Sequence, residues 1–203
     1  MTVLDIAQVR TATKADVPRL ARTLALAFHD DPAGRWYFPH DASRLRRLER
    51  MFRLLFLPKL AVPHGATYTT DGWTGGALWL PPVVEEASPI ENLRLLPTMA
   101  RIWGLGLPHA MRGFEFQEEL HPHEPHYYLN ILGVAPEHQG RGIGSALIRP
   151  ILERCDRDGL PAYLEATTER NRALYERHGF RVAQEVRWPN DGPPLWLMWR
   201  EPA

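Results

Sequence analysis

The segment that decides the fold is His126-Tyr-Tyr-Leu-Asn-Ile-Leu-Gly-Val-Ala-Pro-Glu-His-Gln-Gly-Arg-Gly-Ile-Gly-Ser145. Residues 127–132 are aromatic and aliphatic for the most part, which predicts a largely buried strand. Pro136 has no N–H to donate to a sheet, so the strand should end before it. Three glycines then alternate with Arg141 and Ile143. Because glycine tolerates positive φ and has no Cβ, this pattern predicts a turn that a ligand can approach closely.

A helix should follow the turn. Its apolar positions recur at helical spacing after Gly144, at Ala146, Leu147, Ile151, Leu152 and Cys155. The first N–H groups of a helix have no intrahelical partner, and they carry the positive end of its dipole. The turn and the helix together therefore predict an anion site, most often one for phosphate.

Two common phosphate motifs do not fit this turn. A P-loop needs a lysine after its last glycine, and no lysine follows Gly142 or Gly144. A dinucleotide fold needs Gly-x-Gly-x-x-Gly, whereas the spacing here is Gly-x-Gly-x-Gly. A surface turn that holds no ligand remains the alternative.

Composition narrows the class of protein. The 203 residues suffice for one domain, residues 1–203, with a sizeable core. Lys and Arg total 24, as do Asp and Glu, which predicts no nucleic-acid partner. A single cysteine, Cys155, excludes an intramolecular disulfide framework and should be inert in the core. Residues 1–10 do not resemble a signal peptide, and no apolar run reaches membrane-spanning length. We therefore expect a cytoplasmic protein without a membrane partner.

Other elements follow from periodicity and turn chemistry. Thr13 and Asp16 predict the start of a helix, and Pro32 its end. Asp71-Gly72 predicts a hairpin between two strands. His121-Pro-His-Glu-Pro-His126 is expected to be a rigid connector rather than a metal site, since zinc needs a defined tetrahedral set. The remaining predicted strands are 9–11, 66–70, 75–80, 161–167, 182–188 and 195–200, and the remaining predicted helices are 45–56, 90–104, 110–120 and 169–178.

Two segments resemble a known superfamily. Gln139-Gly-Arg-Gly-Ile-Gly144 fits the pattern Gln/Arg-x-x-Gly-x-Gly/Ala, and Asn171-Arg-Ala-Leu-Tyr-Glu-Arg-His-Gly-Phe180 follows at a short distance. Both are similar to segments of the GNAT superfamily of N-acetyltransferases. The resemblance covers residues 127–188. It implies an α/β (α+β) fold with a mixed, mostly antiparallel central sheet flanked by helices, and acetyl-CoA as co-substrate without a metal.

The resemblance also implies which residues bind acetyl-CoA. The backbone of Leu132, Gly133 and Val134 would lie against the pantetheine and the acetyl carbonyl. Asn171 matches a position that faces the pantetheine, although packing near the start of a helix is the alternative. The pyrophosphate would be held by Gln139, Gly140, Arg141, Gly142, Ile143, Gly144 and Ser145.

Two residues are candidates for catalysis. Tyr175 matches the tyrosine that protonates the departing thiolate in this family, and aromatic packing on the sheet is its alternative. The strand before the glycine turn offers Asn130 and no carboxylate. Glu165 in the next strand is therefore the candidate base, because a carboxylate in an apolar strand is costly unless it is paired or functional. It could act directly, through a water or by orienting the acceptor, and a structural salt bridge is the alternative.

The acceptor should be a small molecule with a primary amine. Asp16-Val-Pro18, Tyr163-Leu-Glu165 and Tyr175-Glu-Arg177 are most similar to family members that acetylate an antibiotic. We expect the acceptor to contact Trp36, Tyr37, Tyr128 and Asn130. Other aromatic candidates are Phe38, Trp103, Phe114 and Phe116. His29, Asp30 and Asp31 could hold its ammonium group or be ordinary loop residues.

The predicted activity is direct transfer of an acetyl group from acetyl-CoA to this amine in a ternary complex. We expect a monomer or a homodimer. Two alternatives remain open: a non-catalytic acyl-CoA sensor, and an enzyme that acetylates protein lysines or N-termini.

Overall fold

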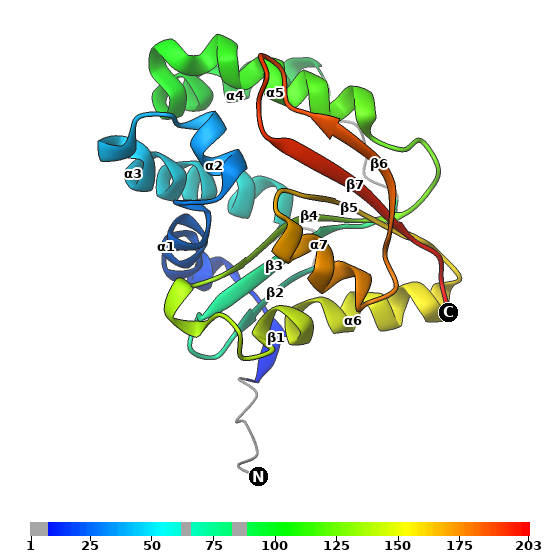
Figure 1. Cartoon of the computed structure of the whole chain (residues 1–203). Coiled ribbons are helices and arrows are strands. Elements are labelled where there is room, and N and C mark those ends of the chain that lie inside the picture. The colour runs from blue at the N-terminus through cyan, green and yellow to red at the C-terminus, as the bar shows by residue number, and fades with distance from the viewer. Residues whose placement is uncertain (1–7, 62–65, 83–88) are drawn as a thin grey trace.

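The computed structural model describes residues 8–61, 66–82 and 89–203, which build one seven-stranded sheet with helices on both faces (Figure 1). The strand order is β1-β2-β3-β4-β5-β7-β6, and only the β4–β5 pair is parallel. This confirms the predicted mixed, mostly antiparallel sheet. The strands are β1 (Val9–Thr11), β2 (Thr67–Thr70), β3 (Gly75–Leu80), β4 (Tyr127–Val134), β5 (Ala162–Ala166), β6 (Arg181–Arg187) and β7 (Pro194–Arg200).

Seven α-helices accompany the described strands: α1 (Val17–Phe28), α2 (Pro32–Tyr37), α3 (Asp41–Met51), α4 (Pro89–Trp103), α5 (Leu107–Leu120), α6 (Ile143–Asp158) and α7 (Glu169–Glu176). Shorter 3-10 turns are η1 (Lys14–Asp16), η3 (Gly104–Gly106) and η4 (Pro136–His138), and η2 (Phe52–Ala61) is a π-helix. Within the part of the chain that the structure describes, no helix is long and apolar enough to cross a membrane. The expectation about a signal peptide rests largely on residues 1–7, which lie outside the described residues.

Adjacent glycines of β3 show that α1 and α6 pack on opposite faces of the sheet. A Cβ on Gly76 would lie 2.6 Å from Leu20 of α1, whereas a Cβ on Gly75 would lie 3.0 Å from Leu147 of α6. Successive residues of a strand point to opposite faces, so the two helices sandwich the strand. Both helices can approach this closely because neither glycine carries a side chain.

The α6 face holds one core, and Cys155 is part of it. The apolar stripe of α6 packs against alternate residues of the sheet, among them Leu129 and Leu164. Cys155 is fully buried, and burial raises the pKa of its thiol to about 12. The predicted inert, core-facing cysteine is confirmed.

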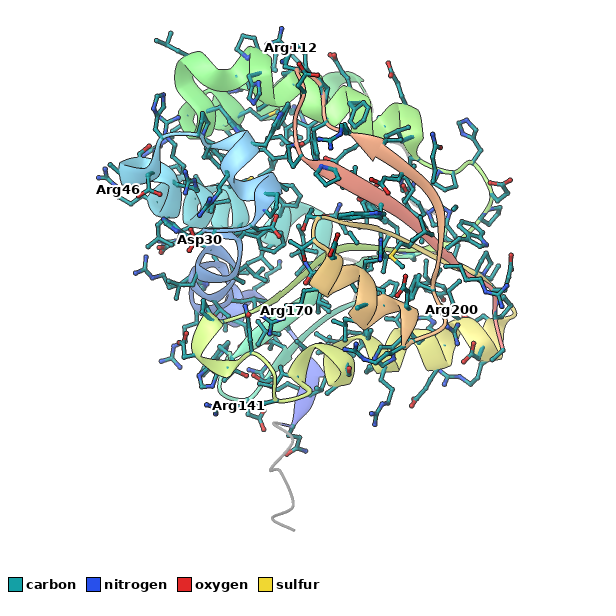
Figure 2. All side chains as sticks on the ribbon, in the orientation of Figure 1. Asp30, Arg46, Arg112, Arg141, Arg170 and Arg200 are labelled. Atoms are coloured by element: carbon teal, nitrogen blue, oxygen red, sulfur yellow. The ribbon has the colours of Figure 1, made fainter. Side chains whose placement is uncertain are left out.

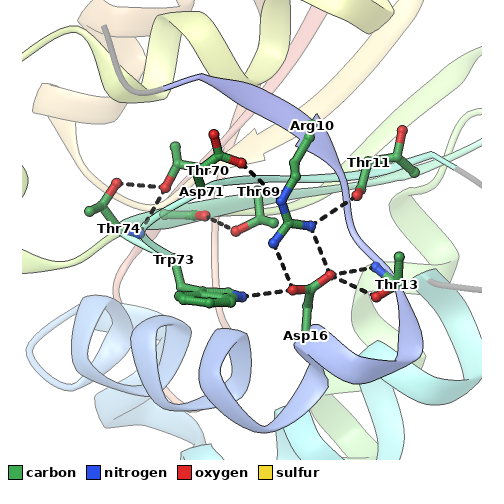
Figure 3. A network of polar contacts seen from close by, with 10 residues as sticks. Arg10, Thr11, Thr13, Asp16, Thr69, Thr70, Asp71, Trp73 and Thr74 are labelled. Atoms are coloured by element: carbon green, nitrogen blue, oxygen red, sulfur yellow. Dashed lines mark hydrogen bonds and ion pairs between the residues drawn. The ribbon is translucent and has the colours of Figure 1, made fainter. Parts of the chain in front are cut away.

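The start of α1 is fixed by a polar cluster around Asp16 (Figure 3). Its carboxylate accepts from the Thr13 N–H at 2.8 Å and from the Thr13 hydroxyl at 2.9 Å. The Arg10 guanidinium donates two further bonds to it at 2.9 and 2.8 Å, and the Trp73 indole N–H donates one at 2.8 Å. Thr13 and Asp16 thus interact as predicted, but they cap the short turn η1, and α1 itself begins at Val17.

Two features differ from the sequence pattern. A short helix, α2, begins at Pro32 directly after α1, because Pro32 has a helical φ and Asp31 caps the helix by accepting from the Ala33 N–H at 2.9 Å. The next predicted helix, 45–56, is divided: α3 ends at Met51 and the π-helix η2 continues from Phe52. Phe52 and Leu55 both remain buried along η2.

Candidate active site

The strands β4 and β5 diverge in the middle of the sheet. They pair only from Tyr127 to Leu129 on β4 and from Ala162 to Leu164 on β5. β4 nevertheless continues to Val134 alongside β3, with a bulge that leaves Asn130 without a residue opposite it. The β5-facing edge of β4 from Asn130 onward therefore offers backbone hydrogen-bonding groups to a ligand.

The glycine turn lies directly beyond that edge. Gly140 and Gly142 have φ of +77° and +80°, and a Cβ on either would meet nothing within 4 Å. Gly142 is the N-cap of α6, whose 16 residues start at Ile143. The first N–H groups of this long helix thus open onto an exposed turn without side chains at its glycines. This geometry suits an anion such as a pyrophosphate.

Several side chains of the turn are already engaged. Gln139 donates to the Val134 carbonyl at 3.1 Å and accepts from Arg170 of α7 at 3.0 Å. Arg141 donates to the Glu137 carbonyl at 3.1 Å, and the Ser145 hydroxyl shares a 2.8 Å hydrogen bond with His178. Figure 2 shows Arg141 on the turn and Arg170 on the neighbouring helix. The backbone N–H groups are therefore freer to bind phosphate than these side chains.

Tyr175 lies on α7, in the core beside the turn. Its side chain is buried and packs against Phe180, with ring centroids 6.0 Å apart. Burial, and secondarily the nearby Asp31 carboxylate, raises the pKa of the Tyr175 hydroxyl, so this group is protonated at neutral pH. α7 begins at its N-cap Thr168, whose hydroxyl accepts from the Asn171 N–H at 3.1 Å, and Asn171 is half-buried in its first turn. A proton donor and the predicted pantetheine-facing residue thus share one short helix.

Glu165 is the centre of a polar network on β5. Its carboxylate accepts from the hydroxyls of Tyr128 at 2.7 Å and Tyr163 at 3.1 Å, and from the Gln117 amide at 3.3 Å. Burial raises the pKa of Glu165, and these three hydrogen bonds oppose the rise. No ion pair involves Glu165 anywhere in residues 8–61, 66–82 and 89–203. The alternative of a structural salt bridge therefore does not apply within that part of the chain.

No sequence pattern pointed to Gln117. It lies on α5, far from Glu165 in the chain, and its amide oxygen accepts from the Tyr37 hydroxyl at 2.9 Å. Gln117 thus links α2 to β5. Tyr37 reaches the Glu165 network through Gln117, whereas Tyr128 donates to Glu165 directly, and the contact of both tyrosines with the acceptor stays a prediction.

The other predicted acceptor residues divide between the site and the core. The Trp36 ring lies 3.9 Å from the His109 ring and 4.7 Å from the Trp188 ring, measured between centroids, and is partly exposed. Phe38 and Trp103 are stacked on each other in the core, 2% and 1% exposed. Phe38 and Trp103 are therefore not available to a ligand. Phe114 packs against the same core.

A cavity of about 520 Å³ lies elsewhere. It is bounded by Arg19 and Arg22 of α1, by Trp73 of the β2–β3 hairpin and by His138 of η4. It borders the connection between β4 and the glycine turn, but neither Tyr175 nor Glu165 lines it. This cavity is therefore not the place where those two side chains meet a substrate.

Comparison with known proteins agrees with this architecture. Residues 108–180 match the model of the acetyltransferase (GNAT) family. An uncharacterized N-acetyltransferase of Schizosaccharomyces pombe is 29% identical over 201 residues, which cover 92% of this chain and 80% of that protein. A crystal structure of histone acetyltransferase HPA2 and related acetyltransferase from Corynebacterium glutamicum is 28% identical and covers 97% of both chains, with a TM-score of 0.75. The polyamine N-acetyltransferase of Drosophila melanogaster shares the fold at 16% identity, 96% and 99% coverage and a TM-score of 0.56.

The fold and these matches define an acyl-transferring enzyme. More closely, they support a GNAT-type N-acetyltransferase. Enzymes of this family use acetyl-CoA as co-substrate. The side-chain-free turn at the N-terminus of α6 and the open edge of β4 fit its pyrophosphate and its amide-containing arm.

Proposed function

We propose that this enzyme moves the acetyl group of acetyl-CoA to a primary amine of a small molecule by direct transfer in a ternary complex. The observation that carries the proposal is a pair of groups: Tyr175 on α7, and Glu165 on β5, one position beyond the last β5 residue that pairs with β4. Tyr175 is a buried, protonated hydroxyl, and Glu165 is a buried carboxylate held only by neutral donors. One can give a proton and the other can take one, as this reaction requires.

Acetyl-CoA would be held mainly by backbone. The edge of β4 at Leu132, Gly133 and Val134 would bind the pantetheine, and Asn171 would face it from α7. The turn from Gln139 to Ser145 would hold the pyrophosphate, with Gly140, Arg141 and Gly142 exposed there and the N–H groups of Ile143, Gly144 and Ser145 opening α6.

The chain supplies a base and an acid for the transfer. Glu165 takes a proton from the acceptor amine, directly or through a water, and the amine nitrogen forms a bond to the acetyl carbonyl carbon. The carbon–sulfur bond then breaks, and the Tyr175 hydroxyl donates its proton to the departing sulfur. Cys155 is fully buried in the core on the α6 face, so a covalent acetyl-cysteine plays no part.

The acceptor class rests on sequence similarity. The stretches Asp16-Val-Pro18, Tyr163-Leu-Glu165 and Tyr175-Glu-Arg177 resemble puromycin N-acetyltransferase. This resemblance favours an aminonucleoside or another antibiotic-like amine and a role in resistance. Trp36, Tyr37 and Tyr128 supply aromatic surface near Glu165, and Asn130 supplies an amide at the bulge. A protein substrate is the second candidate, favoured by the name of the Corynebacterium relative.

Thiol release from acetyl-CoA tests the proposal directly. Purified enzyme would be assayed with puromycin, other aminonucleosides, aminoglycosides, polyamines and a lysine peptide. Release with a small amine is expected, and release with the peptide alone would favour the protein-directed alternative. If no acceptor gives release although calorimetry shows tight acetyl-CoA binding, the protein is a non-catalytic acyl-CoA sensor. If acetyl-CoA does not bind, the assignment of the glycine turn is wrong.

A further inference from the structure

A second carboxylate stands near the C-terminal end of β5, the strand that carries Glu165. Along β5, Leu164 and Ala166 point into the α6 core, whereas Tyr163 packs in the cluster on the opposite face. Side chains alternate along a strand, so Glu165 shares the face of Tyr163. Thr167 directly follows Ala166, the last residue of β5. The Thr167 hydroxyl donates to Asp31 Oδ2 at 2.7 Å. Asp31, at the start of α2, therefore reaches the end of the same strand.

The position of Asp31 relative to Glu165 follows from its contact with Thr167. Glu165 and Thr167 are two residues apart, which is about 7 Å along an extended chain. Asp31 also lies near enough to Tyr175 for its charge to act on that hydroxyl. The two carboxylates thus both belong to the region where the acetyl group is transferred.

Neither carboxylate has a cationic partner. Glu165 is bound by two tyrosine hydroxyls and an amide, and Asp31 by the Thr167 hydroxyl and backbone N–H groups. Across the ranges of the chain that the structure describes, neither residue forms an ion pair. Asp16 is the contrast, because Arg10 holds its carboxylate with two hydrogen bonds.

The pKa values of these carboxyl groups differ according to whether a cation lies beside them. Burial raises the pKa of Asp31 and of Glu165, whereas the Arg10 guanidinium lowers that of Asp16. Removing a carboxylate from water without a counter-ion is costly, and a bound cation would offset that cost. Both residues remain partly exposed, so a ligand can reach them.

Two further features favour a cationic ligand over a purely structural role. Capping of α2 accounts for Asp31 Oδ1, but a serine or asparagine would cap as well without a buried charge. The amide oxygen of Asn130, at the bulge of β4, is buried and has no hydrogen-bond partner in the described residues. An ammonium group is a donor with three N–H bonds, which matches this acceptor as well as the carboxylates.

We propose that the acceptor carries two cationic groups, and that Glu165 and Asp31 each hold one of them. The acceptor is therefore a diamine or polyamine, or a small molecule with two amines at similar spacing. This inference rests on the proposed acetyl transfer and narrows its substrate. A mono-cationic aminonucleoside would leave one carboxylate without a counter-ion.

A matched pair of acceptors tests this. Putrescine and n-pentylamine have the same chain length. In n-pentylamine a methyl group takes the place of one of the two terminal ammonium groups of putrescine. We expect kcat/KM to be about 10- to 100-fold higher for putrescine, the range for hydrogen bonds to a charged group. Equal values for the two acceptors would overturn the inference and leave the acetyl-transfer proposal intact. If neither these nor any other amine is acetylated, the proposed function itself fails.

Variants locate the second charge. In Asp31→Asn the putrescine preference should fall by at least about tenfold, because the amide keeps the shape but removes the negative charge. Asp41→Asn is the control: Asp41 is exposed and pairs with Arg44, so the preference should not change. Should Asp31→Asn fold poorly, Asp31→Ser keeps the cap and tests the same loss of charge. An unchanged preference in both Asp31 variants, or equal losses for both acceptors, would refute the role of Asp31.

Discussion

The Thr167 hydroxyl donates a 2.7 Å hydrogen bond to Asp31 Oδ2, although the two residues are 136 positions apart in the chain. It connects the end of β5 to the start of α2, and so it sets where the Asp31 carboxylate stands relative to Glu165.

Replacing Thr167 with valine should destabilise the fold by about 1–3 kcal/mol, because Asp31 loses a donor at nearly constant shape. The pKa of Asp31, already raised by burial, should rise further. A carboxyl whose folded pKa is raised loses stability as pH rises from its unfolded pKa to its folded one. Urea unfolding should therefore show a larger loss for Thr167→Val near pH 7 than near pH 4. A smaller loss at neutral pH would contradict the linkage.

Tyr175→Phe tests the proposed acid. The ring still fills its place against Phe180, so the fold and acetyl-CoA binding should persist. Turnover should fall about 100-fold or more, as is usual for loss of a general acid. Steady-state kinetics and calorimetry with acetyl-CoA measure the two effects separately. Equal losses in turnover and binding, or no loss in either, would count against this role.

Glu165→Gln tests the proposed base. Glu165 must be ionised to accept a proton, and burial raises its pKa above the ordinary carboxyl value of about 4.3. In the wild type, kcat/KM should therefore rise with pH through that raised pKa. The variant should be about 100-fold slower and should lack this acidic limb. An acidic limb that survives in Glu165→Gln would assign it to another group.

The glycine turn can be tested with two alanines. Gly142 has a φ of +80°, so Gly142→Ala should cost about 1–2 kcal/mol and weaken acetyl-CoA binding. Gly144 lies inside α6, and its Cβ would meet Leu174 at an ordinary 3.4 Å, so Gly144→Ala is the control. Thermal melting with and without acetyl-CoA distinguishes the two. Equal stabilisation of both variants by acetyl-CoA would argue against the turn as its site.

The Asp16 cluster predicts an acid-sensitive start of α1. Asp16→Asn removes a charge that Arg10 binds twice, and should cost about 2 kcal/mol at pH 7. The Arg10 guanidinium holds the pKa of Asp16 well below its usual range. Its contribution is therefore complete above the unfolded pKa of about 3.9 and is lost as pH falls below it. The unfolding free energies of wild type and variant should converge in acid, and a constant difference down to pH 2 would disprove the mechanism.

Local patterns predicted the elements around the site well. The spacing of apolar residues and the positions of Pro136 and the glycines predict β4, the glycine turn and α6. Proline and glycine affect the backbone conformation locally, so a local pattern is enough for these elements. The α2 helix and the π-helix η2 do not follow from such patterns. Asp31 and Pro32 were visible as a helix end, but the same pair also begins α2.

The side-chain network of the site was only partly predictable. Glu165 stood out as a carboxylate in an apolar strand, and Tyr128 and Tyr37 as aromatic candidates. Gln117 could not be found, because its role depends on α5 lying over β5, which no local pattern encodes. Asp31 was one of three candidates for the ammonium group, with His29 and Asp30, and only its contact with Thr167 distinguishes it from them.

The three residue pairs between β4 and β5 have a mechanical consequence. Four strands lie on one side of this short seam and three on the other. A molecule bound along the free edge of β4 would form backbone hydrogen bonds that β5 does not form there. It would thus hold the two parts of the sheet at a set angle. Glu165 lies on β5 and Asp31 is bound to Thr167 just after it, whereas the edge proposed to receive the acetyl donor belongs to β4. The separation of β4 and β5 would then set the distance between the acceptor amine and the acetyl donor.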